Sequence, residues 1–303
     1  MIVVAGEALV DLVIRPDGSV AAKLGGGPYN SARTIGRLGG DVTFLGSVSV
    51  DRFGNQLFER LVADGVSNAG IVRCDLPTTL AAAELDDHGG ATYRFYLDGT
   101  AAPALDHVPA AVSRPAAVHA GTLGLVLQPM ATTITDYISA LPEHTLVMLD
   151  PNCRPRVVPD RNAYLDRLEL LYRRAHVVKL STDDIDYLSP GVDPLSFARA
   201  LVGNGPRALL VTAGGAGAWA ITAHGETMVP GRQVSVADTI GAGDSFGGAF
   251  LAWWMQHGYT VDHLADHRLV VEAVDASQEV SARTCERVGA EPPHRQELSA
   301  RWQ

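Results

Sequence analysis

The sequence from residue 238 to residue 250 reads Asp238-Thr239-Ile240-Gly241-Ala242-Gly243-Asp244-Ser245-Phe246-Gly247-Gly248-Ala249-Phe250. Its first half is a glycine turn and its second half has small and apolar residues at helical spacing, so it predicts a loop that opens into a buried helix. The first N–H groups of a helix lack partners within the helix and carry partial positive charge from the helix dipole. Because glycines let a phosphate approach those N–H groups closely, the turn predicts an anion site.

Asp244 places a carboxylate at this predicted anion site. One interpretation is a helix-capping aspartate after a glycine turn, which is common. The other is a general base that takes the proton from a hydroxyl attacking a phosphoryl group. The stretch alone leaves both open, and the rest of the chain decides between them.

Composition limits the class of protein. The chain has 303 residues, of which 47% are hydrophobic and 19% charged, as in an ordinary globular protein with a large core. A net charge of −10 argues against a nucleic-acid partner or an anionic membrane. The cysteines are odd in number, far apart and outside CxxC spacing, which favours a reduced, cytoplasmic protein without disulfides or a zinc site. The sequence shows neither a signal-peptide pattern nor a run long enough to span a membrane.

Strand and helix patterns alternate along most of the chain. This alternation predicts an α/β fold with a mostly parallel central sheet and helices on both faces. The predicted strands are residues 2–5, 42–46, 117–121, 146–150, 177–180 and 208–212, followed by a hairpin at 218–222 and 227–230. The predicted helices are residues 31–38, 51–63, 130–140, 163–175 and 195–202, the stretch after Gly243, and two C-terminal helices at 264–274 and 277–285.

Two hairpin patterns predict a small separate sheet. One surrounds the turn at residues 16–19, and the other surrounds Asp86-Asp87-His88-Gly89-Gly90. We expect residues 12–23 and 79–100 to form a β-sheet lid, and residues 1–11, 24–78 and 101–303 to form the α/β domain. An extension of the main sheet by these strands stays open on pattern alone.

Polar residues gather where the predicted parallel strands end. In open α/β sheets, ligands bind beyond the carboxyl ends of the strands. Each residue taken singly is explained equally well as a turn, a cap or a strand end, but their shared position predicts a site. These residues are Asp11, Asn30, Asp150, Asn152, Arg154, Lys179, Ser181, Asp183, Asp184 and Thr212.

With these positions in place, the chain resembles the ribokinase/PfkB family of carbohydrate kinases over nearly its whole length. Residues 238–244 resemble the C-terminal signature of the family, DTxGAGD, and residues 25–32 with Leu38-Gly39-Gly40 resemble its N-terminal glycine signature. The two signatures together are specific, whereas either alone is only moderately so. The resemblance implies a ribokinase-like fold and ATP-dependent phosphorylation of a sugar hydroxyl.

The resemblance also implies roles for particular residues. Asp244 would be the catalytic base, and the backbone of Gly241, Ala242 and Gly243 the anion hole. The residues matching sugar-binding positions are Asp11, Gly26, Gly27 and Asn30, and Arg94 and Arg154 are added as candidate substrate contacts. The candidate nucleotide contacts are Lys179, Ser181, Thr212, Gly214, Gly217, Gly241, Gly243 and Ser277. Mg²⁺ would bridge phosphate oxygens, mostly through water, and Asp184 would contact it through a water molecule. Some members of the family hold a monovalent cation such as K⁺, for which the carbonyls of Asp238 and Ile240 are the candidate ligands in this chain.

Two positions depart from the family pattern. The family commonly has Asn-x-x-Glu after the strand that carries Lys179, a pair that organises metal-bound water, and this chain has Ser181 and Asp184 instead. The hydroxyl and the shorter carboxylate change the reach of that pair. Ser277 stands where an asparagine often lies near the adenine.

The resemblance is greatest to fructokinases and 2-keto-3-deoxygluconate kinases, through residues 26–30 and the segment 150–154. Alternative substrates are ribose, another sugar or a nucleoside. As a substrate contact, Arg94 would favour an acidic or phosphorylated sugar, but a solvated arginine on a strand face is the better interpretation of this residue. A different class of protein is also possible on this fold, namely a non-catalytic regulator that binds a sugar or a nucleotide.

A Rossmann dehydrogenase is disfavoured because no G-x-G-x-x-G follows the first strand. The expected partners are a sugar and ATP, with a homodimer formed through the lid as one further arrangement.

Overall fold

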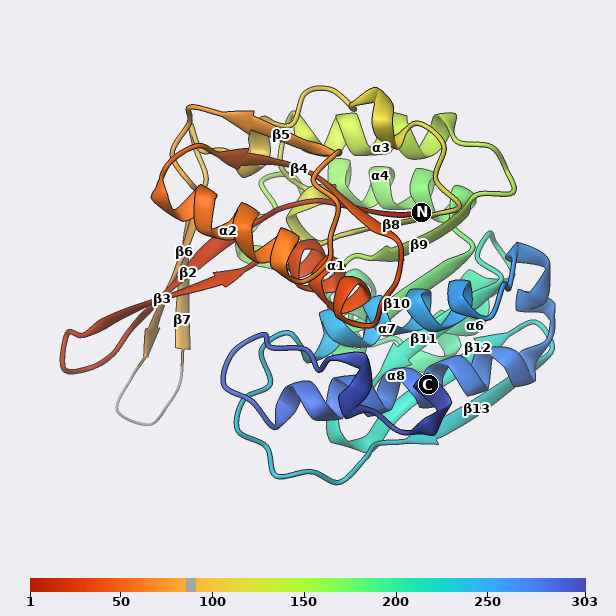
Figure 1. The fold of residues 1–303 in the computed structure, drawn as a ribbon. Coiled ribbons are helices and arrows are strands. Elements are labelled where there is room, and N and C mark those ends of the chain that lie inside the picture. Colours follow the sequence, from red (N-terminus) through yellow and green to blue (C-terminus); the bar gives the residue numbers. More distant parts are fainter. Residues whose placement is uncertain (86–90) are drawn as a thin grey trace.

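The computed structural model describes residues 1–85 and 91–303, and its strands form two sheets (Figure 1). The turn expected at residues 86–90 lies outside the described residues. In the described chain the large sheet has nine strands, and their order across the sheet is β13 (Gly225–Pro230), β12 (Gly217–Thr222), β11 (Ala208–Thr212), β10 (Val177–Ser181), β9 (Leu146–Asp150), β8 (Ala117–Gly121), β1 (Ile2–Ala5), β4 (Val42–Ser49) and β5 (Ile71–Cys74).

The large sheet is parallel from β5 to β11, and only the β12–β13 hairpin at one edge is antiparallel. This confirms the predicted mostly parallel α/β fold. Two short elements, β5 and α5, were missed by the sequence patterns. Parallel strands need a crossover between them, so the polar residues that follow successive strands meet along one edge of the sheet.

Helices cover both faces of the large sheet (Figure 1). Successive strand residues point to opposite faces, and in β1 the side chains of Ile2 and Val4 enter one core while those of Val3 and Ala5 enter the other. The first core is covered by α1 (Gly27–Arg37), α2 (Arg52–Ala63), α7 (Ala242–Gln256) and α8 (His267–Cys285). The second is covered by α3 (Met130–Ala140), α4 (Arg161–Arg174), α5 (Thr182–Leu188) and α6 (Pro194–Val202).

The small sheet is separate from the large one, as expected, and projects to one side of the molecule (Figure 1). Its order is β3 (Val20–Gly25), β2 (Leu9–Ile14), β6 (Leu80–Leu85) and β7 (Ala91–Tyr96), with β2 and β6 parallel and the outer pairs antiparallel. Both strands of the first hairpin are longer than expected, because their pairing continues to Leu9 and Gly25. Asp11 therefore lies within β2, and not in a loop after β1.

The C-terminal helices were predicted wrongly as two. The structure has one helix, α8, across residues 267–285. The hydroxyl of Ser277 donates to Ala273 O within that helix at 2.7 Å, so a serine that the pattern treated as a new helix start sits in an unbroken helix.

After α8 the chain returns to the side of α1. Arg33 and Arg37 of α1 both bind Asp64, the residue that ends α2, and both bind Glu291. Arg33 Nη1 also donates to Ala290 O at 2.8 Å, and Arg37 Nη1 donates to the carbonyl of residue 292 at 2.6 Å. This mostly buried ion cluster fixes the C-terminal segment against α1. None of the helices in the described residues is long and apolar enough to cross a membrane.

Candidate active site

A cavity of about 660 Å³ lies between the carboxyl edge of the large sheet and the small sheet. One face of the small sheet forms one wall through Leu9, Asp11, Val13, Ala83, Tyr93 and Phe95. The α/β domain forms the other walls, and among their polar side chains are Glu7, Asn30, Asn152, Arg154, Lys179 and Asp244. The cavity therefore collects half of the strand-end residues singled out in the sequence, namely Asp11, Asn30, Asn152, Arg154 and Lys179.

Asp244 is the third residue of α7 and faces this cavity. Its Oδ2 accepts a hydrogen bond from Asn30 Nδ2 at 2.9 Å, and its backbone oxygen accepts one from Ser31 Oγ at 3.0 Å. Burial raises the pKa of Asp244, while the Asn30 bond and the charges of Lys179 and Arg154 oppose that rise. The helix start and these neighbours hold the carboxylate in a fixed direction through Oδ2.

The glycine turn before α7 depends on a left-handed residue. Gly241 has φ 77°, and a Cβ there would lie 2.5 Å from the Cβ of Ala290. Of the three predicted donors, Ala242 N–H donates to Thr239 O at 3.2 Å, whereas the described residues supply no acceptor for the N–H groups of Gly241 and Gly243. The turn thus offers two of its three expected N–H groups to a ligand.

Lys179 brings a positive charge to this turn. It lies in β10, and its Nζ would be only 3.0 Å from a Cβ added at Gly243. Its Nζ donates to Asp150 Oδ2 at 2.7 Å, and both side chains are buried. Burial alone would lower the pKa of Lys179, but Asp150, Asp184 and Asp244 outweigh burial and raise it, so the ammonium stays charged.

Asp11 approaches the cavity from the small sheet. Burial and the nearby Asp244 raise the pKa of Asp11 to about 6, and Arg154 opposes them. Gly25 on the neighbouring strand makes room for it, because a Cβ there would lie 2.4 Å from Asp11 Oδ2. The structure thus brings Asp11, Asn30, Arg154 and Asp244 together.

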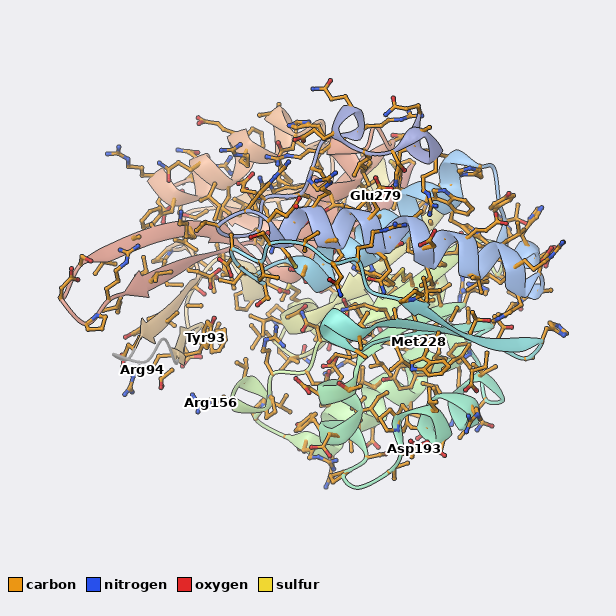
Figure 2. The ribbon with its side chains drawn as sticks, turned by 90° about the horizontal axis from the view of Figure 1, so that it is seen from below. Tyr93, Arg94, Arg156, Asp193, Met228 and Glu279 are labelled. Atoms are coloured by element: carbon orange, nitrogen blue, oxygen red, sulfur yellow. The ribbon has the colours of Figure 1, made fainter. Side chains whose placement is uncertain are left out.

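Arg94 does not line the cavity in the described structure. Its neighbours Tyr93 and Phe95 do, and side chains alternate along a strand, so Arg94 lies on the opposite face of β7 and pairs with Glu84 at 3.1 Å. This corrects the expectation that Arg94 contacts substrate. Arg156, which the sequence reasoning did not single out, lines the cavity instead, and Figure 2 shows it extending from the α/β domain toward the side of β7.

Ser181 and Asp184 form a capping box at the start of α5. Asp184 Oδ2 accepts from Ser181 N and Ser181 Oγ at 2.8 and 2.6 Å, Ser181 Oγ accepts from Asp184 N, and Asp184 Oδ1 accepts from Cys153 N at 2.6 Å. With its side chain buried and both oxygens engaged, Asp184 does not fit the expected contact with metal-bound water. The structure gives this pair a helix-capping role instead.

The remaining predicted nucleotide residues lie outside the cavity walls. Thr212 ends β11 beside Ser181, and Gly214 and Gly217 follow in the next turn, so all three continue the carboxyl edge of the sheet beyond Lys179. Ser277 is fully buried in α8. A side chain without exposed surface has no access to a base, which corrects the expectation for Ser277.

The model of the pfkB family carbohydrate kinases matches residues 1–296 of the chain. The chain belongs to the pfkB family of carbohydrate kinases.

This kinase is similar to several fructokinases. It is 31% identical to the fructokinase of Rhizobium leguminosarum bv. trifolii over 258 residues, which cover 83% of this chain and 79% of that protein. It is 32% identical to the fructokinase of Klebsiella pneumoniae over 269 residues, or 86% of each chain. A crystal structure of fructokinase with bound ATP from Xylella fastidiosa superposes with a TM-score of 0.87 at 30% identity, covering 95% of this chain and 93% of that one.

The cavity of this kinase also contains residues that sequence reasoning did not assign to a site. Glu7 lies two residues after the end of β1, and its place at a strand end was the signal that would have found it. Thr122 was not singled out either, whereas Asn152 was among the strand-end residues. The two line the cavity with positive φ angles of 50° and 41°, and Asn152 Nδ2 donates to Thr122 Oγ1 at 3.3 Å. Such backbone conformations are uncommon outside glycine and gather at functional sites, but no sequence pattern marks them.

Proposed function

We propose that this kinase transfers the γ-phosphoryl group of ATP to a hydroxyl of fructose or a closely similar ketose, with Asp244 as the general base. The single observation that carries the proposal is the position of Asp244 in the first turn of α7. There it faces the cavity, is held by Asn30 and stands beside the glycine turn. Fructose is favoured over other sugars because the similar proteins are named fructokinases.

In the proposed step, the Asp244 carboxylate takes the proton of the acceptor hydroxyl. The hydroxyl oxygen forms a bond to the γ-phosphorus as the bond from that phosphorus to the β–γ bridging oxygen breaks, and ADP leaves. The N–H groups of Gly241 and Gly243 and the Lys179 ammonium are proposed to stabilise the negative charge on the transferring group. Mg²⁺ carried by the phosphates of ATP would add to this charge neutralisation.

For that ion we propose phosphate oxygens and water as ligands. The engagement of both Asp184 oxygens in the α5 cap supports this choice, and Mg²⁺ in kinases retains several waters. A monovalent cation such as K⁺ is proposed beside the backbone carbonyls of Asp238 and Ile240.

The sugar subsite is proposed to consist of Asp11, Asn30, Arg154 and the backbone at Gly26 and Gly27. Asn30 Oδ1 supports this, because it is buried and has no hydrogen-bond partner among the described residues. A sugar hydroxyl would supply the missing donor. The nucleotide phosphates are proposed to follow the edge from Lys179 toward Thr212, Gly214 and Gly217.

The test is ADP release measured with fructose, glucose, ribose, 2-keto-3-deoxygluconate and adenosine as acceptors, for the native enzyme and Asp244→Asn. We expect the highest kcat/KM with fructose and a loss of at least about 10²-fold in kcat for the variant. A higher kcat/KM with another acceptor would contradict fructose as the substrate. If no acceptor gave turnover that depends on Asp244, the catalytic proposal would be wrong and a binding regulator would be favoured.

We propose further that two copies associate through their small sheets. Val20 and Tyr96 support this, since they expose 58% and 57% of their surface on that sheet. Sedimentation of the native chain and of Tyr96→Asp tests it, because a dimer that the substitution does not weaken would use another surface.

A further inference from the structure

Glu7 is a buried carboxylate that the proposed chemistry does not use. It follows β1, lines the cavity and is only 1% exposed. Its Oε1 accepts from Gly27 N at 3.0 Å and its Oε2 accepts from Gly124 N at 3.1 Å. No ion pair joins it to a lysine or arginine in the described part of the chain.

The position of Glu7 is electrostatically unfavourable for a carboxylate. Burial and the charge of Asp244 raise the pKa of Glu7 to about 8, against hydrogen bonds from its own backbone, Gly27 and Gly124. Burying a carboxylate without a partner cation lowers the stability of a fold. The presence of Glu7 at this position therefore indicates that its hydrogen bonds have a specific role. Its two backbone partners indicate that role.

Those partners belong to two walls of the cavity. Gly27 is the first residue of α1, three positions before Asn30. Gly124 lies in the short 3₁₀ turn Thr122–Leu125, which directs Thr122 into the cavity. The walls touch one another, because a Cβ added at Gly27 would lie 2.4 Å from Thr122 Oγ1. One carboxylate therefore sets the spacing between both segments.

We propose that Glu7 is a positioning residue for the sugar subsite. Its two oxygens hold the first turn of α1 and the 122–125 turn at a fixed separation, so that Asn30 meets Asp244 and both Asn30 and Thr122 present polar atoms to the acceptor. The proposal rests on the proposed function of Asn30 in sugar binding.

Glu7→Gln tests this with a matched control in the same chain. Asp51 also bridges two segments, accepting from Gly54 N and from Thr78 N, each at 2.8 Å, but it does not line the cavity. In Glu7→Gln and Asp51→Asn, one acceptor oxygen is replaced by an NH₂ group that faces a backbone N–H. Both variants are expected to lose thermal stability.

Only Glu7→Gln is expected to raise the KM for the acceptor, by about tenfold, as one lost hydrogen bond would. The KM for ATP should change less than about twofold in both variants, because neither side chain bonds a residue of the proposed nucleotide edge from Lys179 to Gly217. Glu7→Asp, which keeps the carboxyl group but is one methylene too short to reach both N–H groups, should behave like Glu7→Gln. An acceptor KM unchanged in both Glu7 variants, or raised equally by Asp51→Asn, overturns the proposal.

A measurement without turnover separates this proposal from the proposed function. In ¹⁵N-labelled enzyme, the side-chain amide signal of Asn30 should move in Glu7→Gln and stay in place in Asp51→Asn, whichever acceptor the enzyme uses. An Asn30 signal that does not move contradicts the positioning role even if the kinase phosphorylates fructose. A shifted signal in an enzyme without Asp244-dependent turnover would retain the positioning role and reject the catalytic one.

Discussion

At the scale of single residues, the cavity brings together several carboxyl groups whose negative charges repel one another. Burial raises the pKa values of Glu7, Asp11 and Asp244, and the negative charge of Asp244 raises those of the other two further. Lys179 and Arg154 oppose the rise at Asp244. A carboxylate that must accept a proton benefits from a raised pKa, since the proton affinity of a general base grows with it.

Asn30→Ala should affect both binding and the pH profile. It removes the hydrogen bond that lowers the pKa of Asp244, so the base becomes protonated at a higher pH and the acid limb of the kcat/KM profile moves upward. The KM for the sugar should also rise, by about tenfold. Steady-state kinetics across pH checks both, with Asn55→Ala on the exposed side of α2 as the control. Unchanged KM and pH profile would remove Asn30 from the site.

Glu7→Gln should also change how stability depends on pH. Glu7 has a pKa of about 8 in the fold against an ordinary value of 4.5, so the folded state holds a proton that the unfolded state releases between these values. The native protein therefore loses stability as pH rises from 4.5 to about 8, and the loss is complete above about pH 8. Because glutamine does not titrate, the variant should gain relative to the native protein as pH rises. Denaturant midpoints of both proteins at several pH values measure this, and a difference independent of pH would contradict it.

At the scale of elements, the starts of helices decide what the site offers. α7 begins with an uncapped turn and leaves two N–H groups to a ligand, whereas α5 begins with a closed capping box. α5 directly follows the parallel strand β10, and α7 follows the loop after the antiparallel strand β13. Both helices begin at the carboxyl edge of the large sheet. The contrast explains why the turn at residues 241–243 suits an anion and the segment 181–184 does not.

Ser181→Ala should therefore act as the loss of a cap. We expect about 1 kcal/mol less free energy of unfolding, and an unchanged Mg²⁺ dependence of the KM for ATP. Asp160→Ala, which removes the cap of α4, is the matched control for stability. A raised Mg²⁺ requirement at unchanged stability would instead support the water-mediated metal role first expected of this pair.

Gly241→Ala tests the turn itself. The new Cβ would meet Ala290 at 2.5 Å and require φ 77°, so the N–H groups should lose their alignment and kcat should fall by about 10²-fold. Gly258→Ala is the control, because Gly258 has φ 70° with no atom within 4 Å of its Cβ position. That control should lose about 1 kcal/mol of stability and keep its kcat. Equal losses of kcat in both would mean that strain alone, and not the anion hole, is responsible.

At the scale of the whole molecule, the ion cluster of Arg33, Arg37, Asp64 and Glu291 joins three distant parts of the chain. It ties α1 and the end of α2 to the segment that follows α8. Through Arg33 and Ala290 it also supports Gly241. The same helix, α1, thus carries Asn30 at its start and this cluster in its later turns.

Asp64→Asn should destabilise the protein strongly. Its side chain and those of both arginines are buried, and neutralising Asp64 leaves two buried guanidinium charges with Glu291 as their one remaining carboxylate, which costs about 3–5 kcal/mol. Glu226→Gln, which breaks the more exposed pair with Arg199, should cost less than about 1 kcal/mol. Chemical denaturation of both variants measures the difference. Equal losses of unfolding free energy in the two variants would show that the buried cluster stabilises the fold no more than a surface ion pair does.

The sequence by itself determined the family, the α/β class, most strands and helices, and the glycine turn before Asp244. These follow from local signals, namely periodicity, glycine turns and signature spacing, that do not depend on distant contacts. The separate small sheet was one of two open interpretations, and the pairing of β2 with β6 decided it.

Only the tertiary structure decided which of the candidate side chains meet. Asn30 and Asp244 are 214 positions apart, and their contact depends on how α1 packs against α7. A strand pattern shows that Tyr93 and Arg94 point to opposite faces, but which face meets the cavity depends on how the small sheet sits over the large one. Asp184 caps α5 together with Ser181, three positions away, but its other oxygen accepts from the backbone of Cys153. The two N–H partners of Glu7 lie 20 and 117 positions along the chain. Such contacts arise from packing between elements, and packing leaves no local signature in the sequence.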